Sequence, residues 1–493
     1  MRKINAFYNL AADNLFYMFM KGFVYPIFGI LITALLSCNS DMKQSESNND
    51  TVSIVVDSSE NLIAAEKFFN FEQINNVADF LTGKGCNDCS EFCKSDFYTA
   101  YTASVKTQWD ELNKKTLYSA VEWSKNNISD FVNDTASLFY PFGGPDILFA
   151  RTFFPKARTY ILFGLENPGR LPDFEKFSED QLKQYAQGME FSFRYINRFG
   201  FFVAEHMRDD FNNKYFDGTI HPVVYALAIN GCQIESYRPV SLSKNGTLSD
   251  PSPQSAKSIN GYELKFMSDG LLRTLYYFRL DASDPPMTQH LEFAYFINKF
   301  GNLNCYIKSA SYLLQENAFS IMRNIIFDNC KNILQDESGI AYSEVKKHYQ
   351  TELYGTYQRP VKVFSMFPQN DLRIALEKGS KPLPFKIGYT SQFNNSIMMV
   401  CRKESPEAFS QNTASSDTVY KVQFKVSWNK LAENEPIFNG IPEVDFYTDG
   451  SYYKYTAGCK KSQAECSDIL KLLVKKGYSD AFVVIFSKGK RIK

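Results

Sequence analysis

The stretch VYKVQFKV, residues 419–426, alternates apolar and polar side chains without a break. Successive side chains of a β-strand point to opposite faces, so this alternation predicts a strand that is apolar on one face only. The apolar positions Tyr420, Val422, Phe424 and Val426 would pack against a core. The polar positions Lys421, Gln423 and Lys425 would meet solvent or a ligand.

The residues that follow predict a small β-α-β module extending to Lys493. A second alternating strand is expected from Tyr452 to Thr456, after the turn-forming pair Asp449-Gly450. The sequence SQAE at 462–465 has the capping-box pattern that opens a helix, and apolar residues recur at helical spacing from Cys466 to Val474. Gly477 would end that helix, and a buried strand is expected from Phe482 to Phe486.

Three segments of this module resemble a SPOR domain, a peptidoglycan-binding module of bacterial envelopes. They are YKVQ at 420–423, YKYTAG at 453–458 and KGYSDAFVV at 476–484. The resemblance implies a ferredoxin-like sheet with two helices behind it, whose open face binds glycan strands. It places Gln423 on that face, with Lys421, Tyr453 and Lys454 as further ligand-binding residues. Residues 427–444 depart from the family, because Pro436 and Pro442 interrupt the stretch that should hold the first helix.

Charge is consistent with this expectation. Residues 419–493 carry 13 Lys and Arg against 8 Asp and Glu, whereas the whole chain has 54 of each. A basic sheet would favour encounter with the peptide carboxylates of peptidoglycan. The neutral balance of the whole chain gives no indication of nucleic acid as a partner. Cys459 and Cys466 flank the start of the predicted helix, and either a disulfide or two free thiols is compatible with their spacing.

The N-terminus predicts a lipoprotein signal. Residues 23–37 are apolar or small, too few for a membrane-spanning helix of about 20 residues, and Leu35-Leu36-Ser37 precede Cys38 as in bacterial lipoproteins. We expect a signal peptide at 1–37, with Met20 as a candidate start, and lipid on Cys38; an uncleaved signal anchor is the alternative. A polar tether would span 38–60. By analogy with lipoprotein sorting, Asn39 favours the outer membrane of a Gram-negative bacterium, facing the periplasm.

Residues 61–402 predict one large mixed domain, α+β or α/β, joined to the C-terminal module by a polar linker at 403–418. Expected strands are 159–165, 223–229, 262–267 and 272–280, with Asp269-Gly270 as a hairpin turn. A capping box at 178–181 would open one helix, and 320–334 reads as another. In Cys86-x2-Cys89-x3-Cys93, a local disulfide is favoured over a metal site, because no fourth ligand lies nearby.

Candidate chemistry in the central domain is sparse. Asp146, beside Gly143-Gly144, and Glu166, at the end of a predicted strand, are possible acids, and His206 with Asp209 and His221 could form a base or a metal pair. A structural turn is favoured for the loop of Asp146, and a structural role explains Glu166 equally well. No His-Glu-x-x-His or Gly-x-Ser-x-Gly motif occurs, and no cofactor or metal is predicted.

These patterns together favour a non-enzymatic envelope lipoprotein that tethers a membrane to the cell wall. A wall hydrolase or transferase, with catalysis in the central domain and the C-terminal module as its targeting device, is the alternative. A third possibility is a platform for other envelope proteins.

Overall fold

The computed structural model describes most of the chain from Phe71 onward. The described ranges are 71–199, 212–213, 216–251, 259–393, 395–403, 418–427, 429–432, 434–449, 452–461, 464–478, 481–487 and 490–491. Two compact units make up the chain, one ending at Lys403 and the other beginning at Glu404. None of the helices within these ranges combines the length and apolar character that crossing a bilayer requires.

The first unit is a mixed α/β domain built on a ten-stranded sheet with the order β11-β12-β10-β9-β1-β2-β8-β7-β5-β6. The five central strands, β10 to β8 in this order, pair in parallel, and the strands at both edges pair antiparallel. The strands are β1 (Leu138–Tyr140), β2 (Thr159–Gly164), β5 (Gln233–Leu242), β6 (Leu248–Ser249), β7 (Asn260–Ser268), β8 (Leu271–Arg279), β9 (Leu303–Ile307), β10 (Cys330–Gln335), β11 (Gln350–Gly355) and β12 (Ile397–Arg402).

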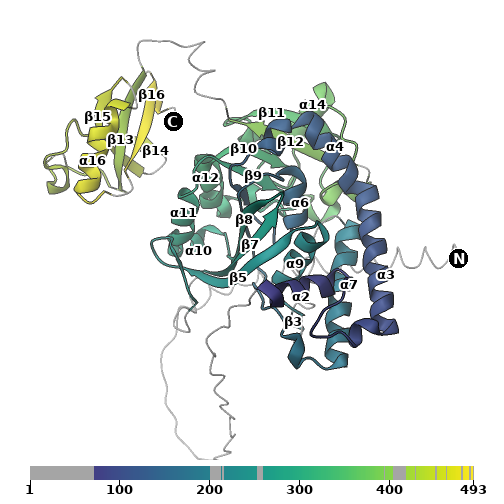
Figure 1. The fold of residues 1–493 in the computed structure, drawn as a ribbon. Coiled ribbons are helices and arrows are strands. Elements are labelled where there is room, and N and C mark those ends of the chain that lie inside the picture. Colours follow the sequence, from purple (N-terminus) through teal and green to yellow (C-terminus); the bar gives the residue numbers. More distant parts are fainter. Residues whose placement is uncertain are drawn as a thin grey trace, which may run out of the picture. The chain divides into compact units, whose positions relative to one another are not determined.

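Helices cover both faces of this sheet (Figure 1), which buries the central strands on two sides. Strand β2 shows the arrangement, because Tyr160 and Leu162 join one apolar core while Ile161 and Phe163 join the other. The first core is covered by α2 (Phe71–Leu81), α3 (Asp96–Leu112), α4 (Tyr118–Asn127), α5 (Ser129–Asn133), α6 (Ile147–Phe153), α7 (Glu179–Phe199) and α9 (Ile220–Ile229). The second is covered by α10 (Asp284–Gln289), α11 (Leu291–Asn298), α12 (Ser320–Asn329), α13 (Tyr342–Val345) and α14 (Asn370–Gly379).

Several local predictions are confirmed. The strand predicted at 159–165 is β2, and those at 262–267 and 272–280 are β7 and β8. Asp269 and Gly270 form the turn between β7 and β8, with φ of 53° and 71°. The capping box before α7 also forms, because the Ser178 amide donates to Gln181 Oε1 at 2.6 Å and the Gln181 amide donates to Ser178 Oγ at 3.4 Å.

Two element predictions are wrong, for different reasons. Residues 223–229 lie in helix α9, where every residue from Ile220 to Ala228 is buried, so no polar face marks the helical period. The helix predicted over 320–334 ends at Asn329, and the chain continues as strand β10, which pairs with β9 and β12. Leu62, Ala65, Phe68 and Phe69 recur at helical spacing and predict a helix at the start of the domain, but they lie outside the described residues.

The second unit is a separate antiparallel sheet with the order β14-β15-β13-β16-β17. Helix α16 (Ser467–Lys475) and the 3-10 helix η9 (Pro436–Phe438) pack on one face of the sheet. Their contacts with the core are made by Ile469, Leu473 and Phe438. The other elements are β13 (Thr418–Ser427), β14 (Asp445–Asp449), β15 (Tyr452–Lys460), η10 (Ala464–Cys466), β16 (Phe482–Ser487) and β17 (Lys490–Arg491).

The predicted strands and the C-terminal helix of this unit are confirmed, with one change of boundary. The α-helix begins at Ser467, after η10, and Ser462 and Gln463 of the expected capping box lie outside the described residues. Gly477 follows the helix with φ of 97°, a conformation that glycine adopts without strain. Between β13 and β14, in the described part of residues 427–444, only η9 is helical, as the two prolines lead one to expect.

Candidate functional site

The face of the C-terminal sheet opposite α16 gathers polar and aromatic side chains from five strands. Cross-strand register pairs Gln423 with Thr456 and with Phe482, and pairs Lys454 with Tyr447. Directly paired residues share a face, and Val422 and Tyr455, their neighbours in the strands, belong to the core under α16. We call the face formed by Lys421, Gln423, Tyr447, Lys454, Phe482, Phe486 and Arg491 the open face.

A β-bulge between Gln423 and Lys425 interrupts the alternation of faces that was predicted for β13. Val422 and Phe424 pack as expected, but the register brings Val426 opposite Lys454, and Val426 is 43% exposed. One extra residue in a strand reverses the faces of all that follow, so Val426 leaves the packed side.

Tyr447 lies across the open face and connects distant strands. Its hydroxyl donates to Gln423 Oε1 at 2.6 Å and accepts from Arg491 Nη1 at 2.8 Å. Its ring meets the Phe486 ring edge-on, with centroids 5.2 Å apart. Gln423 is therefore only 6% exposed, and its side-chain amide, predicted to bind ligand, lies beneath Tyr447.

Cations surround the aromatic rings of the open face. Lys421 Nζ lies 5.3 Å from the Phe486 ring centre, Lys454 Nζ lies 6.0 Å from that of Tyr447, and the Arg491 guanidinium lies 5.9 Å from that of Phe482. Lys421 also pairs with Asp445 at 2.5 Å. Partial burial opposes ionisation of Asp445, but hydrogen bonds from Lys421 and from the Phe446 amide outweigh it and lower its pKa.

Three other predicted residues of this unit lie elsewhere. Tyr453 packs against the core under α16, because neighbours in a strand point to opposite faces, and the sheet separates it from Gln423. Neither Cys459, which is exposed, nor Cys466, which is buried, takes part in a disulfide. The contributions of Tyr447, Phe482 and Arg491 were missed, although the segment DFYTD at 445–449 continues the alternating pattern.

The buried carboxylate of Asp146 has three partners within the central domain. Its Oδ1 accepts from the Phe149 amide at 3.2 Å and caps α6, while Oδ2 accepts from the Tyr140 hydroxyl at 2.9 Å. Lys308 Nζ completes the set at 2.6 Å, and both charged side chains are buried. Burial lowers the pKa of Lys308, and Asp146 opposes that effect. These contacts describe a structural anchor.

Glu166 lies just after β2, close to the same loop. Its Oε2 accepts from the Tyr277 hydroxyl at 3.3 Å, and it rests so close to Gly164 that a methyl group at that position would collide with it. Burial raises the pKa of Glu166, with the Tyr277 hydrogen bond opposing the rise. The predicted pair of His206 and Asp209 lies outside the described residues.

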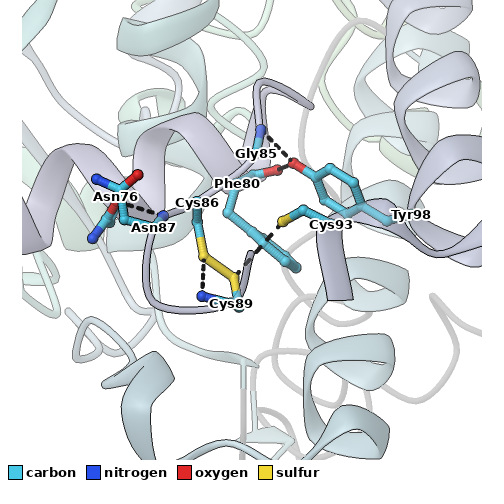
Figure 2. Close-up of a disulfide and its surroundings, with 8 residues drawn as sticks. All are labelled: Asn76, Phe80, Gly85, Cys86, Asn87, Cys89, Cys93 and Tyr98. Atoms are coloured by element: carbon cyan, nitrogen blue, oxygen red, sulfur yellow. Dashed lines mark hydrogen bonds between the residues drawn. A yellow bond between two sulfur atoms is a disulfide. The ribbon is translucent and has the colours of Figure 1, made fainter. Parts of the chain in front are cut away.

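The predicted local disulfide is confirmed. Cys86 is bonded to Cys89, and Cys93 Sγ lies 3.9 Å from Cys89 Sγ (Figure 2). The Tyr98 hydroxyl accepts from the Gly85 amide at 3.0 Å and donates to the Phe80 carbonyl at 2.9 Å, which holds this loop against α2. Among the described residues, only these three cysteines form a trio of His, Cys, Asp or Glu side chains with ligand atoms this close.

Comparison of the chain with protein-family models, with curated proteins and with solved structures finds no match.

Proposed function

We propose that the C-terminal unit binds the glycan strands of peptidoglycan through its open face, and that the chain is a cell-envelope lipoprotein tethering a membrane to the wall. The observation that carries this proposal is the combination of aromatic rings and cations on a sheet face that α16 leaves uncovered. Strand order supports it too, because β13 to β16, counted one to four, lie in the order 2-3-1-4 of a ferredoxin-like sheet.

The chemistry of the open face suits a sugar polymer with carboxylates. Phe482 is 45% exposed and the Tyr447 ring is partly exposed, so both offer apolar area on which a pyranose ring can stack. Lys454 and Arg491 stand beside these rings and would pair with the carboxylates of stem peptides. Gln423 would act indirectly, by holding Tyr447 in place.

The other end of the proposed tether is lipid on Cys38. A multiply acylated cysteine anchors stably, and glycan binding at the far end of the chain would join the membrane to the wall. The outer membrane of a Gram-negative bacterium, with the protein facing the periplasm, is the proposed location. Other envelope proteins are proposed as partners of the central domain.

An enzyme in the central domain is the second candidate, and the observation that favours it is Glu166. A carboxyl group whose pKa is raised by burial, placed where a parallel strand ends, has the character of a general acid. In that case the open face would deliver a wall hydrolase or transferase to its substrate.

Pelleting of the detergent-solubilised full-length protein with purified sacculi tests the proposal. We expect Phe482→Ala to weaken binding about fivefold to tenfold, because loss of one stacked ring removes about 1 kcal/mol or slightly more. Phe446→Ala is the matched control, since Phe446 is 36% exposed but contacts Tyr453 and Tyr455 on the other side of the sheet. Equal binding by both variants and the unaltered protein would reject the open face as the binding surface. Release of soluble muropeptides would favour the enzyme.

A further inference from the structure

The carboxyl edge of the central sheet has a topological switch point between β1 and β9. The connection from β1 to β2 passes through α6, which packs in the first core, whereas the connection from β9 to β10 passes through α12, which packs in the second. Loops that leave two neighbouring parallel strands toward opposite faces open a crevice between them, and open α/β sheets bind ligands there. The Lys308–Asp146 pair spans this point.

Beside it, the loop after β10 buries two consecutive carboxyl groups, Asp336 and Glu337, each with no exposed surface. Asp336 is fully provided for: Oδ2 accepts from the Ser309 amide at 2.8 Å, and Oδ1 accepts from the Ser338 amide and hydroxyl at 2.9 and 2.5 Å. Glu337 differs, because neither of its carboxylate oxygens makes a hydrogen bond of ordinary length and angle, although the Thr390 hydroxyl and amide lie close to them. An unsatisfied buried carboxylate is costly, so it calls for a partner.

The main chain holds Glu337 firmly in this position. Its carbonyl oxygen accepts from Gln315 Nε2 at 3.1 Å and from Gln369 Nε2 at 2.8 Å, two side chains from distant parts of the sequence. These bonds fix the main chain at Glu337, and with it the point from which the buried side chain extends.

Two unpartnered hydroxyl groups accompany this carboxylate. Tyr312, with no exposed surface, and Thr390, 2% exposed, each have an oxygen without a hydrogen-bond partner. Burial raises the pKa of Tyr312 well above its usual range, and the nearby charge of Glu337 adds to that rise. The hydroxyl and amide of Thr390 lie close enough to Glu337 to lower its pKa, against the larger rise caused by burial and Asp336.

The backbone beside these groups is strained. Ser309, Ser311 and Tyr312 have φ of 53°, 52° and 58°, so three non-glycine residues within four adopt the left-handed conformation. Each costs on the order of 1 kcal/mol or more, and such strain concentrates at functional sites. Here it brings the Ser309 amide to Asp336.

We propose that Glu337, with the hydroxyl oxygens of Tyr312 and Thr390, binds a hard divalent cation of the Ca²⁺ or Mg²⁺ class. The available atoms are all oxygens, which these cations prefer over nitrogen and sulfur ligands. The cation supplies the positive partner that Glu337 lacks and ties the loop after β10 to Tyr312 and Thr390.

Terbium luminescence on the chelator-treated full-length protein tests the proposal, because Tyr312 would sensitise Tb³⁺ bound at Glu337. We expect emission that Ca²⁺ or Mg²⁺ displaces, and a rise in Tm when either cation is added. Glu337→Gln should weaken Tb³⁺ binding at least tenfold and abolish the rise in Tm. Glu344→Gln, which alters a carboxylate paired with Lys347 on the surface of α13, should change neither result.

Thr390→Val is the second variant, for use if Glu337→Gln fails to fold, and it should weaken binding as well. Absence of both displaceable emission and a cation-dependent Tm in the unaltered protein would overturn the proposal, as would unchanged binding by the Glu337 and Thr390 variants. A higher Tm for Glu337→Gln with no effect of cations on either protein would mean that Glu337 is a buried neutral acid, which also rejects the cation site.

Discussion

The Asp146–Lys308 pair offers a quantitative test of whether Asp146 is an anchor of the fold. Lys308→Met keeps the length of the side chain and its contact with Phe149, whose ring centre lies 3.8 Å from Lys308 Nζ, but removes the positive charge. Removing one partner of a buried ion pair costs about 3 to 5 kcal/mol, because the other charge stays buried without compensation. The Tyr140 and Phe149 donors still serve Asp146, so we expect about 3 kcal/mol.

Asp146→Asn should cost a similar amount, of about 3 kcal/mol, because it leaves the Lys308 ammonium buried without its carboxylate. The double variant removes both charges, so its cost should fall short of the sum of the single costs by about 2 kcal/mol or more. Urea unfolding measures this cycle in a Trp428→Phe background, where the remaining tryptophans, Trp109 and Trp123, both report on the central domain. Additive single costs, or a cost below about 1 kcal/mol for Lys308→Met, would refute the coupling.

Three further predictions concern other contacts. Because burial raises the pKa of Glu166, the contribution of this group to the stability of the central domain should be fully present below its unfolded pKa of about 4.3 and lost as pH rises through the folded pKa. Glu166→Gln should remove this component from the pH dependence of urea midpoints measured from about pH 4 to pH 7, and an unchanged slope would contradict it. Tyr447→Phe leaves Gln423 Oε1 buried without its hydrogen-bond donor and should destabilise the C-terminal unit by about 1 to 3 kcal/mol. The loss would be measured as faster hydrogen exchange in β13, and Tyr453→Phe, on the other face of the sheet, is the control. Lys421 helps to lower the pKa of Asp445, so this pair should stabilise the C-terminal unit above the unfolded Asp pKa of about 3.9 and lose its effect as pH falls through the folded pKa. Lys421→Met should raise the pKa of Asp445 in an NMR titration, and no change would rule out the pairing in solution.

Prediction from the sequence succeeded where short-range patterns carry the information. The alternation at 419–426 yielded β13, the turn Asp269-Gly270 yielded the β7–β8 hairpin, and the capping box at Ser178 marked the start of α7. It failed in α9, because residues buried on all sides show no periodic contrast, and in β10, which is a strand through its pairing with the distant strands β9 and β12. It also missed the bulge in β13, which depends on the pairing of that strand with β15.

The candidate sites also have some features that local sequence predicts and others that depend on contacts between distant residues. Local composition pointed to a basic, aromatic C-terminal unit and to a disulfide among Cys86, Cys89 and Cys93. It did not show that Tyr447 would cover Gln423, that Asp146 would be neutralised by Lys308, or that Glu337 would be buried beside Tyr312 and Thr390.

The sequence by itself determined the strands β13, β15 and β16 and the helix that Gly477 ends in the C-terminal unit, since these depend on interactions within a few residues. Only the tertiary structure decided which side chains remain available for binding. Asp146 and Lys308 are 162 positions apart in the chain, and they meet because β1 and β9 lie side by side in the sheet. Such contacts follow from strand order and from the burial that accompanies it, and no periodicity along the chain records them.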